Sequence, residues 1–447
     1  MAWNIKVIDF RSRMRLAALV VTIGLVATLG AVRADIGRPL ALRALAVGYS
    51  IWDPFSEESS VAMGPQQMAA QGGERDQARQ LEEWFPEYAC EVITKGAHRP
   101  SPEPVRFSHE SLAAPRVAEF GRLCEAILKD ATDIFSVSCR VRQLTEHGLG
   151  NRLDQLGSDP IEILHAAQAG EPLTCRPFAL LYGSCLASRG FTWRMLGLSA
   201  DGTRFDHAVV EVYVPEYGKW VLVDPDFNVA YRRNGEWLNA ADLHREWRRF
   251  NSRKRGNVPD SDRALGKSPE RYEGPVELVE LGPEGAALRE TNLLPVGDGV
   301  GLRYYENITY STRNNYLSAS YPKGHPKATF QYVLKSSGEK LPICPEAQPV
   351  TDLGDLYFAV GRSNVWLAKK LDLNSVQLEF STWTPNFSEF EVRFDDGDWE
   401  SCAGASAPLK IKSGRTKVEV RSVNAAGLRG EAVEFVVLAT ARSTVSN

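Results

Sequence analysis

The sequence has no strong excess of charge of either sign. Its 52 Lys and Arg residues nearly balance 56 Asp and Glu residues, and the formal net charge is −4. This balance gives no reason to expect nucleic acid or an anionic membrane as the main partner. A long internal repeat and a heptad pattern are also absent, which argues against a repeat array or a coiled coil. The composition is that of an ordinary folded protein, and its 447 residues are enough for two or three domains.

Long apolar runs are scarce as well, and the only one spans the 17 residues from Leu16 to Val32. A basic head precedes it, and Val32-Arg33-Ala34 offers a small-residue cleavage pattern. The run is at the short end for a spanning helix. We therefore expect residues 1–34 to be a cleaved signal peptide or a signal anchor. Both interpretations place the rest of the chain outside the cytoplasm (periplasmic, secreted, or anchored and facing outward), and we expect membrane contact only through this segment.

The cysteines are few and odd in number. An exported protein can hold disulfides, but an odd count leaves at least one thiol free. Three bridges plus one free nucleophile would account for all of them, and several buried, unpaired thiols are the alternative. The seven positions are Cys90, Cys124, Cys139, Cys175, Cys185, Cys344 and Cys402.

Shifts in composition predict the domain organisation. We expect residues 35–115 to form an N-terminal stem or linker, because much of this stretch is rich in Gly, Gln, Ser and charge. Apolar residues at helical spacing begin a domain that we place at residues 116–250. Residues 251–300 are rich in charge, Pro and Gly, which indicates a linker. Short alternating runs then predict a β-rich region at residues 301–440.

Cys175 stands at the start of a predicted helix. Thr174 is a good N-cap residue, and Pro177 is tolerated only in a first turn. Apolar residues then recur on one face until Arg189-Gly190 ends the helix. The dipole and the free N–H groups at this end favour a thiolate and can help to hold an oxyanion. A cysteine can also be a small buried hydrophobe, which is how we interpret Cys185 on the apolar face.

A β-hairpin is predicted after this helix. Residues 207–214 alternate polar and apolar side chains with a period of two, as a half-buried strand does. Residues 215–218 then form a turn, and residues 219–224 return the chain. Pro225 cannot donate to a ladder, so it ends the pairing.

The hairpin register brings a histidine and a carboxylate together. If the four turn residues close the hairpin, Val214 lies opposite Lys219. Counting back, His207 and Asp224 project from one face as diagonal neighbours. Thiol catalysis needs this set: a cysteine nucleophile, an imidazole that takes its proton, and a carboxylate that orients the imidazole. Asp226 falls directly opposite His207 and remains a rival carboxylate.

Three motifs in this order resemble the transglutaminase-like family, whose core is shared with papain-type peptidases. The resemblance covers residues 125–250, and its motifs read T-C-R-P-F-A-L-L-Y-G-S-C-L-A-S-R-G-F-T-W, D-H-A-V-V-E-V-Y-V and K-W-V-L-V-D-P. It implies an α+β fold in which N-terminal helices pack on an antiparallel sheet. The chain departs from the family in lacking a glycine close before the cysteine and in placing Arg176 directly after it.

The resemblance also implies the roles of the site residues. Cys175 would be the nucleophile, His207 the general base and Asp224 the residue that orients it, which favours Asp224 over Asp226. The expected reaction is cleavage or transfer of a peptide or side-chain amide through a thioester, with a protein or peptide as substrate and no cofactor. The second oxyanion donor stays open, with Gln143 and Trp193 as guesses.

Residues 388–399 and 414–427 resemble the immunoglobulin-like β-sandwich modules of secreted bacterial proteins. We place such a module at about residues 370–440. Its expected role is that of a binding or spacer module, with a polymer or protein of the cell envelope as the partner it would bind.

Two alternatives to a thiol enzyme follow from the sequence. The first is a metal site, for which the hydrophilic candidates lack a tight ligand spacing, so that we expect no metal; these are Asp206, His207, Asp224, Asp226 and His244. The second is a non-catalytic envelope or secreted scaffold that keeps the fold and binds a partner through its β domain.

Overall fold

The computed structural model describes residues 73–96, 107–148, 158–255, 276–282, 287–293, 301–319, 330–335, 341–402 and 404–442. The signal segment expected at residues 1–34 lies outside this part of the chain. Within it, the fold is a mixed α+β arrangement with several sheets, as expected for the fold class. None of the helices described is both long and apolar enough to cross a membrane.

The larger sheet has ten strands and forms the centre of the first structural unit. Their bounds are β2 Trp193–Ser199, β3 His207–Val214, β4 Lys219–Asp224, β5 Val229–Arg233, β6 Glu236–Trp237, β7 Val276–Leu281, β8 Ala287–Leu293, β9 Asn307–Ser311, β10 Phe330–Lys335 and β11 Gln348–Pro349. The spatial order is β11-β10-β9-β2-β3-β4-β5-β7-β8, and β6 pairs with β5. All of these pairings are antiparallel except that of β10 with β11.

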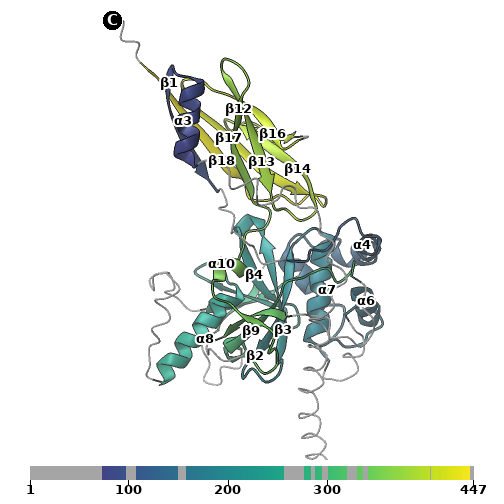
Figure 1. Ribbon diagram of the computed structural model, residues 1–447. Coiled ribbons are helices and arrows are strands. Elements are labelled where there is room, and N and C mark those ends of the chain that lie inside the picture. Colours follow the sequence, from purple (N-terminus) through teal and green to yellow (C-terminus); the bar gives the residue numbers. More distant parts are fainter. Residues whose placement is uncertain are drawn as a thin grey trace, which may run out of the picture.

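Helices cover both faces of this sheet (Figure 1). One face carries α4 (Pro115–Leu128), α5 (Ile134–Arg142), α6 (Pro160–Gln168) and α7 (Cys175–Ser188), and the other carries α8 (Ala240–Arg255). The period of two in β3 produces this division. Val210 and Val212 pack into the core beneath α7, whereas Val209 packs with Leu243 of α8.

The larger sheet extends beyond the domain that the sequence places at residues 116–250. β7 and β8 arise within the stretch expected to be a linker, residues 251–300, and β9 comes from the expected β-rich region. Leu196 of β2 pairs with Tyr310 of β9, which covers what would otherwise be an exposed strand edge. Composition does not reveal that these segments belong to one sheet, because two strands can pair however far apart they lie in the sequence.

The second unit consists of two antiparallel sheets around one core. The larger has the order β1-β18-β17-β14-β15, with bounds β1 Tyr88–Lys95, β14 Phe387–Phe394, β15 Glu400–Cys402, β17 Gly414–Asn424 and β18 Val433–Ala441. The smaller has the order β12-β13-β16, with bounds β12 Ser363–Lys370, β13 Ser375–Thr382 and β16 Ser406–Lys410. Phe380 from one sheet and Phe390 from the other meet edge to face in the shared core. The expected module at residues 370–440 falls in this unit.

The second unit also contains residues that we expected to be a stem or linker, at 35–115. Helix α3 (Glu74–Trp84) and β1 precede the first unit in sequence, yet β1 pairs with β18 along its whole length. Leu81, Phe85 and Val92 are buried in the core of the second unit. Figure 1 shows α3 and β1 beside the strands of this unit. The polar composition around α3 hides this role, because only a few apolar side chains are needed to complete a core formed by distant strands.

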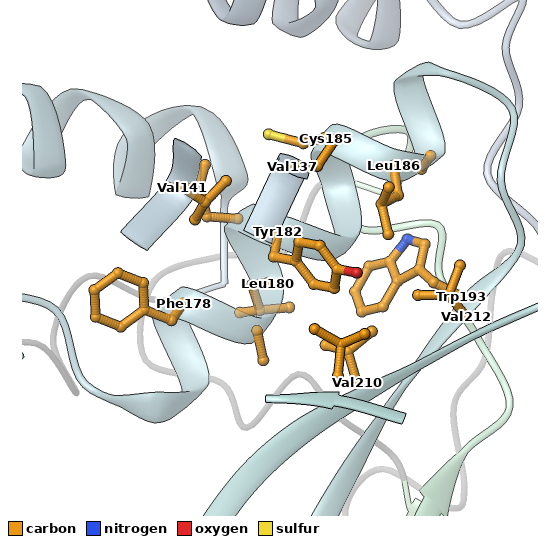
Figure 2. Close-up of a cluster of buried hydrophobic side chains, with 14 of the residues drawn as sticks. Val137, Val141, Phe178, Leu180, Tyr182, Cys185, Leu186, Trp193, Val210 and Val212 are labelled. Carbon is orange, nitrogen blue, oxygen red and sulfur yellow. The ribbon is translucent and has the colours of Figure 1, made fainter. Parts of the chain in front are cut away.

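Helix α7 is the central element of the first unit. The sequence predicts one apolar face, but every residue from 177 to 187 is buried, because helices lie on one side of α7 and the sheet on the other (Figure 2). Cys185 is buried as expected, and its Sγ lies 3.7 Å from that of Cys124, at hydrogen-bond distance for sulfur but too far for a disulfide bond. All seven cysteines are free thiols in the structure. The structure therefore shows unpaired thiols and not the three disulfides of the other hypothesis.

Gly183 allows the close approach of α7 to the sheet, and this leads to a stability prediction. A Cβ at Gly183 would overlap the ring of Trp193, which is fully buried. Ala normally stabilises a helix interior relative to Gly by about 1 kcal/mol. We expect Gly183→Ala instead to destabilise the protein by about 1–3 kcal/mol through overpacking.

The matched control is Gly121→Ala in α4, where an added Cβ meets nothing within 4 Å. We expect this variant to gain about 0.5–1 kcal/mol in the free energy of unfolding. Urea denaturation followed by circular dichroism measures both variants. Equal effects of the two substitutions would contradict the packing argument.

Candidate active site

Cys175 is the first residue of α7, and Thr174 is the N-cap residue, as the sequence predicts. The Thr174 backbone is extended, and its side chain makes no capping hydrogen bond. The hydroxyl therefore leaves the first-turn N–H groups of α7 uncapped at the end where the thiol lies. Cys175 is half-buried. A nucleophile beside such N–H groups is placed to form an anionic intermediate that they can stabilise.

Strands β3 and β4 form the predicted hairpin in the predicted register. Val214 pairs with Lys219, and a short 3-10 turn over Pro215–Tyr217 connects the strands. The register makes His207, at the start of β3, a diagonal neighbour of Asp224, at the end of β4. Their side chains meet: His207 Nε2 lies 2.6 Å from Asp224 Oδ2.

The Asp224 carboxylate is held from its other side. Its Oδ1 accepts hydrogen bonds from the backbone N–H groups of Asp226 and Phe227, each at 3.1 Å. The side chain is only 3% exposed. Bonds from the following turn orient the carboxylate, so that Oδ2 points at His207. Asp224 is thus a rigid acceptor that can hold one tautomer of the imidazole.

His207 is poised to carry a positive charge. Burial opposes protonation of its ring, but the Asp224 carboxylate and the Cys175 thiol together outweigh burial and raise the pKa of His207 well above its ordinary value. Because Nε2 is engaged by Asp224, Nδ1 is the nitrogen left for the thiol. The imidazole is therefore arranged to accept a proton from Cys175 and keep it near neutral pH.

A second carboxylate completes the cluster. Cys175 Sγ, a ring nitrogen of His207 and a carboxylate oxygen of Asp226 all lie within 4.8 Å of one another. In the described part of the chain, this is the one group of three such side chains close enough to hold a metal ion. The structure thus brings together all three residues expected at the site, and it adds the rival carboxylate as a near neighbour.

Asp226 has a partner of its own, which the sequence analysis did not identify. Its Oδ1 lies 2.7 Å from His147 Nδ1, while its Oδ2 is buried without a hydrogen-bond partner. Burial raises the pKa of Asp226, and the contact with His147 only partly offsets this. The carboxylate at hydrogen-bond distance from His207 Nε2 is that of Asp224. No sequence pattern marks His147, which reaches the site through a backbone bridge to Leu173.

The other residues considered from the sequence lie elsewhere. Trp193 packs on Gly183, about 12 Å along the helix from Cys175 at 1.5 Å per residue, so it is not placed as an oxyanion donor. The amide of Gln143 donates to Cys139 Sγ. His244 is buried on α8, and its Nδ1 contacts the Tyr305 carbonyl at 2.7 Å.

An exposed aromatic ring borders the site. Phe227 follows the aspartates in sequence and is 63% exposed. Its ring centroid lies 5.1 Å from that of His207 and 6.3 Å from that of His147. The turn after β4 thus places an exposed apolar ring beside both imidazoles.

None of the protein-family models searched matches this chain, and no curated protein matches it either.

Proposed function

We propose that this chain is an exported, transglutaminase-like thiol enzyme that cleaves or transfers a peptide or side-chain amide through a thioester on Cys175. One observation carries the proposal: a half-buried thiol at a helix N-terminus lies against an imidazole that is bonded to a buried carboxylate at 2.6 Å. Each member has the role that amide chemistry requires of it.

In the first half of the reaction, Cys175 Sγ attacks the carbonyl carbon of the amide while His207 takes the thiol proton. The carbonyl oxygen becomes an oxyanion, which the first-turn N–H groups of α7 stabilise. The C–N bond then breaks, and His207 donates its proton to the leaving amine. Asp224 keeps its contact with His207 Nε2 and stabilises the imidazolium.

In the second half, a nucleophile attacks the thioester carbonyl and His207 takes its proton. The C–S bond breaks, and the proton is returned to the Cys175 sulfur. With water the product is an acid, and with an amine it is a new amide. We favour hydrolysis, because water is always present at the site, whose thiol is half-buried.

The fold supports the proposal. An antiparallel sheet covered by helices, with the nucleophile on the most buried helix, fits the papain and transglutaminase-like core. The two-sheet second unit fits an immunoglobulin-like sandwich that serves as a binding or spacer module. The basic head and apolar run of residues 1–34 support export.

A binding role without catalysis is the second candidate. It rests on the second unit, where the turn between β12 and β13 exposes Leu373 (87%) and Leu371 (45%). Exposed apolar side chains at a loop tip suit contact with a protein or polymer of the cell envelope. In this reading the Cys175 site is inherited and inactive.

Mass spectrometry of the thioester tests the enzyme reading. The protein is incubated with a panel of peptide amides, with and without an added amine, and the Cys175 peptide is examined for an acyl adduct. We expect an adduct in the wild type, none in Cys175→Ala, and a rate lowered on the order of 100-fold or more in His207→Ala.

Cys402→Ala is the control, because Cys402 is also half-buried but lies in the second unit. It should form the adduct at the wild-type rate. If no panel member acylates Cys175 in the wild type and the thiol has no unusual reactivity, the enzyme reading falls and the binding role takes its place.

A further inference from the structure

We propose that Cys175, His207 and Asp226 form a binding site for a thiophilic divalent cation such as Zn²⁺, and that the bound cation blocks the thiol. The three side chains come from α7, β3 and the turn after β4, and their ligand atoms lie within 4.8 Å of one another. Thiolate, imidazole and carboxylate are the three side-chain groups that zinc takes most readily.

Each of the two non-sulfur ligands is oriented by a hydrogen-bonded partner that contacts its other ligand atom. His207 uses Nε2 for Asp224, at 2.6 Å, which leaves Nδ1 for the cation. Asp226 uses Oδ1 for His147, at 2.7 Å, which leaves Oδ2 for the cation. Metal sites are supported in this way, with a hydrogen-bonded partner that orients each ligand.

The Asp226 oxygen provides an independent reason to expect a ligand. Oδ2 is buried and has no hydrogen-bond partner, and the residue as a whole is 2% exposed. A buried carboxylate oxygen without a donor is unfavourable. A cation between Oδ2, Sγ and Nδ1 would remove that penalty. On binding, the one proton shared by the thiol and the imidazole passes to solvent.

The geometry requires only a small adjustment. Zinc bonds of about 2.0–2.3 Å set tetrahedral ligand atoms roughly 3.3–3.8 Å apart. Ligand atoms now within 4.8 Å must therefore draw in by at most roughly 1 Å, which small rotations within the present rotamers supply. Cys175 is half-buried, so the cation can enter from solvent and a water can take the fourth position.

Occupancy would inhibit the proposed reaction. The cation would use the sulfur lone pair that attacks the amide and the His207 nitrogen that takes the proton. This consequence rests on the proposed function, whereas cation binding does not.

Titration of the full chain with Co²⁺ tests the site, because a sulfur–cobalt bond has a charge-transfer absorption in the near ultraviolet. We expect this absorption in the wild type, its loss in Cys175→Ser, and its displacement by Zn²⁺. Asp226→Asn should weaken Co²⁺ binding at least about tenfold. His147→Ala should weaken it about 10–100-fold, because His147 orients a ligand without touching the cation.

The matched control is Asp206→Asn, one residue from His207 in sequence. Its carboxylate is engaged by Arg204 and by the backbone N–H of Ala200, not by the cluster. Co²⁺ binding should match the wild type. Circular dichroism confirms that each variant is folded.

The site proposal is overturned if the wild type shows no sulfur–cobalt absorption, or if a folded Asp226→Asn binds Co²⁺ as tightly as the wild type. Alkylation of Cys175 without metal reports separately on the proposed function. An ordinary thiol that still binds Co²⁺ through Asp226 would leave the site standing and remove the enzyme. An activated thiol without cobalt binding would do the reverse.

Discussion

Iodoacetamide should alkylate Cys175 at nearly the same rate at pH 6 and pH 8 in the wild type, and far more slowly at pH 6 in His207→Ala. The Asp224 carboxylate and the thiol raise the pKa of His207 against the effect of burial. A histidine with a raised pKa stays cationic to a higher pH than an ordinary one, so the cation beside Sγ persists as the pH rises toward the His207 pKa. It favours the reactive thiolate, and the effect fades only as the pH rises through the His207 pKa.

The magnitude follows from the titration of an ordinary thiol, which has a pKa of about 8.5. Without the imidazolium, we expect the rate to fall on the order of 50-fold or more between pH 8 and pH 6, as the thiolate fraction falls. With the imidazolium present, we expect the alkylation rate to change by less than about threefold between pH 8 and pH 6. The slope of rate against pH is a better measure than the absolute rate, because a strongly stabilised thiolate is also a weaker nucleophile.

Peptide mapping must identify the modified residue, since Cys90 and Cys402 are half-buried as well. Cys402→Ala, which leaves the site untouched, serves as the control and should reproduce the wild-type profile. An equally steep profile in wild type and His207→Ala would show that the pair is not activated. The three residues would then have only a structural role, and the second unit would be the part to test for a binding function.

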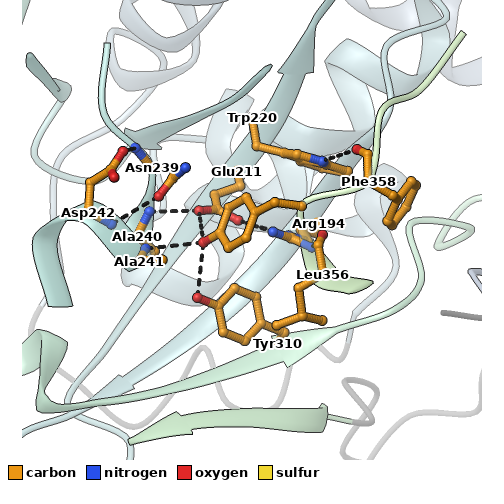
Figure 3. A network of polar contacts seen from close by, with 11 residues as sticks. Arg194, Glu211, Trp220, Asn239, Ala240, Ala241, Asp242, Tyr310, Leu356 and Phe358 are labelled. Atoms are coloured by element: carbon orange, nitrogen blue, oxygen red, sulfur yellow. Dashed lines mark hydrogen bonds and ion pairs between the residues drawn. The ribbon is translucent and has the colours of Figure 1, made fainter. Parts of the chain in front are cut away.

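Arg194→Ala should destabilise the first unit by about 3–5 kcal/mol. Arg194 on β2 and Glu211 on β3 form a buried ion pair, with Nη2 and Oε2 2.6 Å apart and side chains 2% and 0% exposed (Figure 3). Removal of the guanidinium leaves Glu211 as a buried charge without its counterion. In the wild-type fold the carboxylate is fully buried, so solvent does not screen it.

The pair is the centre of a larger network (Figure 3). The guanidinium lies 4.2 Å from the centroid of the Trp220 ring, and it donates to the Leu356 carbonyl. Glu211 Oε1 also accepts from the Tyr357 hydroxyl at 2.8 Å. Residues distant in sequence thus depend on one charge pair, which is why its loss should affect the whole unit.

Urea denaturation of Arg194→Ala, followed by circular dichroism and tryptophan fluorescence, measures the effect. Arg79→Ala is the control: Arg79 pairs with Asp76 in α3, where the side chains are 70% and 60% exposed. Such surface pairs contribute about 0–1 kcal/mol. A loss below about 1 kcal/mol in Arg194→Ala would contradict the buried-pair argument.

The sequence by itself determined the catalytic candidates, because each is positioned by local rules. A helix start places Cys175, and strand alternation with a four-residue turn places His207 beside Asp224. Val214 pairs with Lys219 as counted from the turn. These are short-range relations in which backbone geometry leaves few alternatives.

Only the tertiary structure decided which other segments meet at these elements. It paired β1 with β18, and it added β9 to the edge of β2. It also brought His147 to Asp226, across 79 residues of chain. Such partners are chosen by burial and by backbone groups that need a hydrogen bond, and these conditions depend on the whole fold. A linear pattern does not record them, so the stem, the linker and the second histidine were beyond what the sequence could predict.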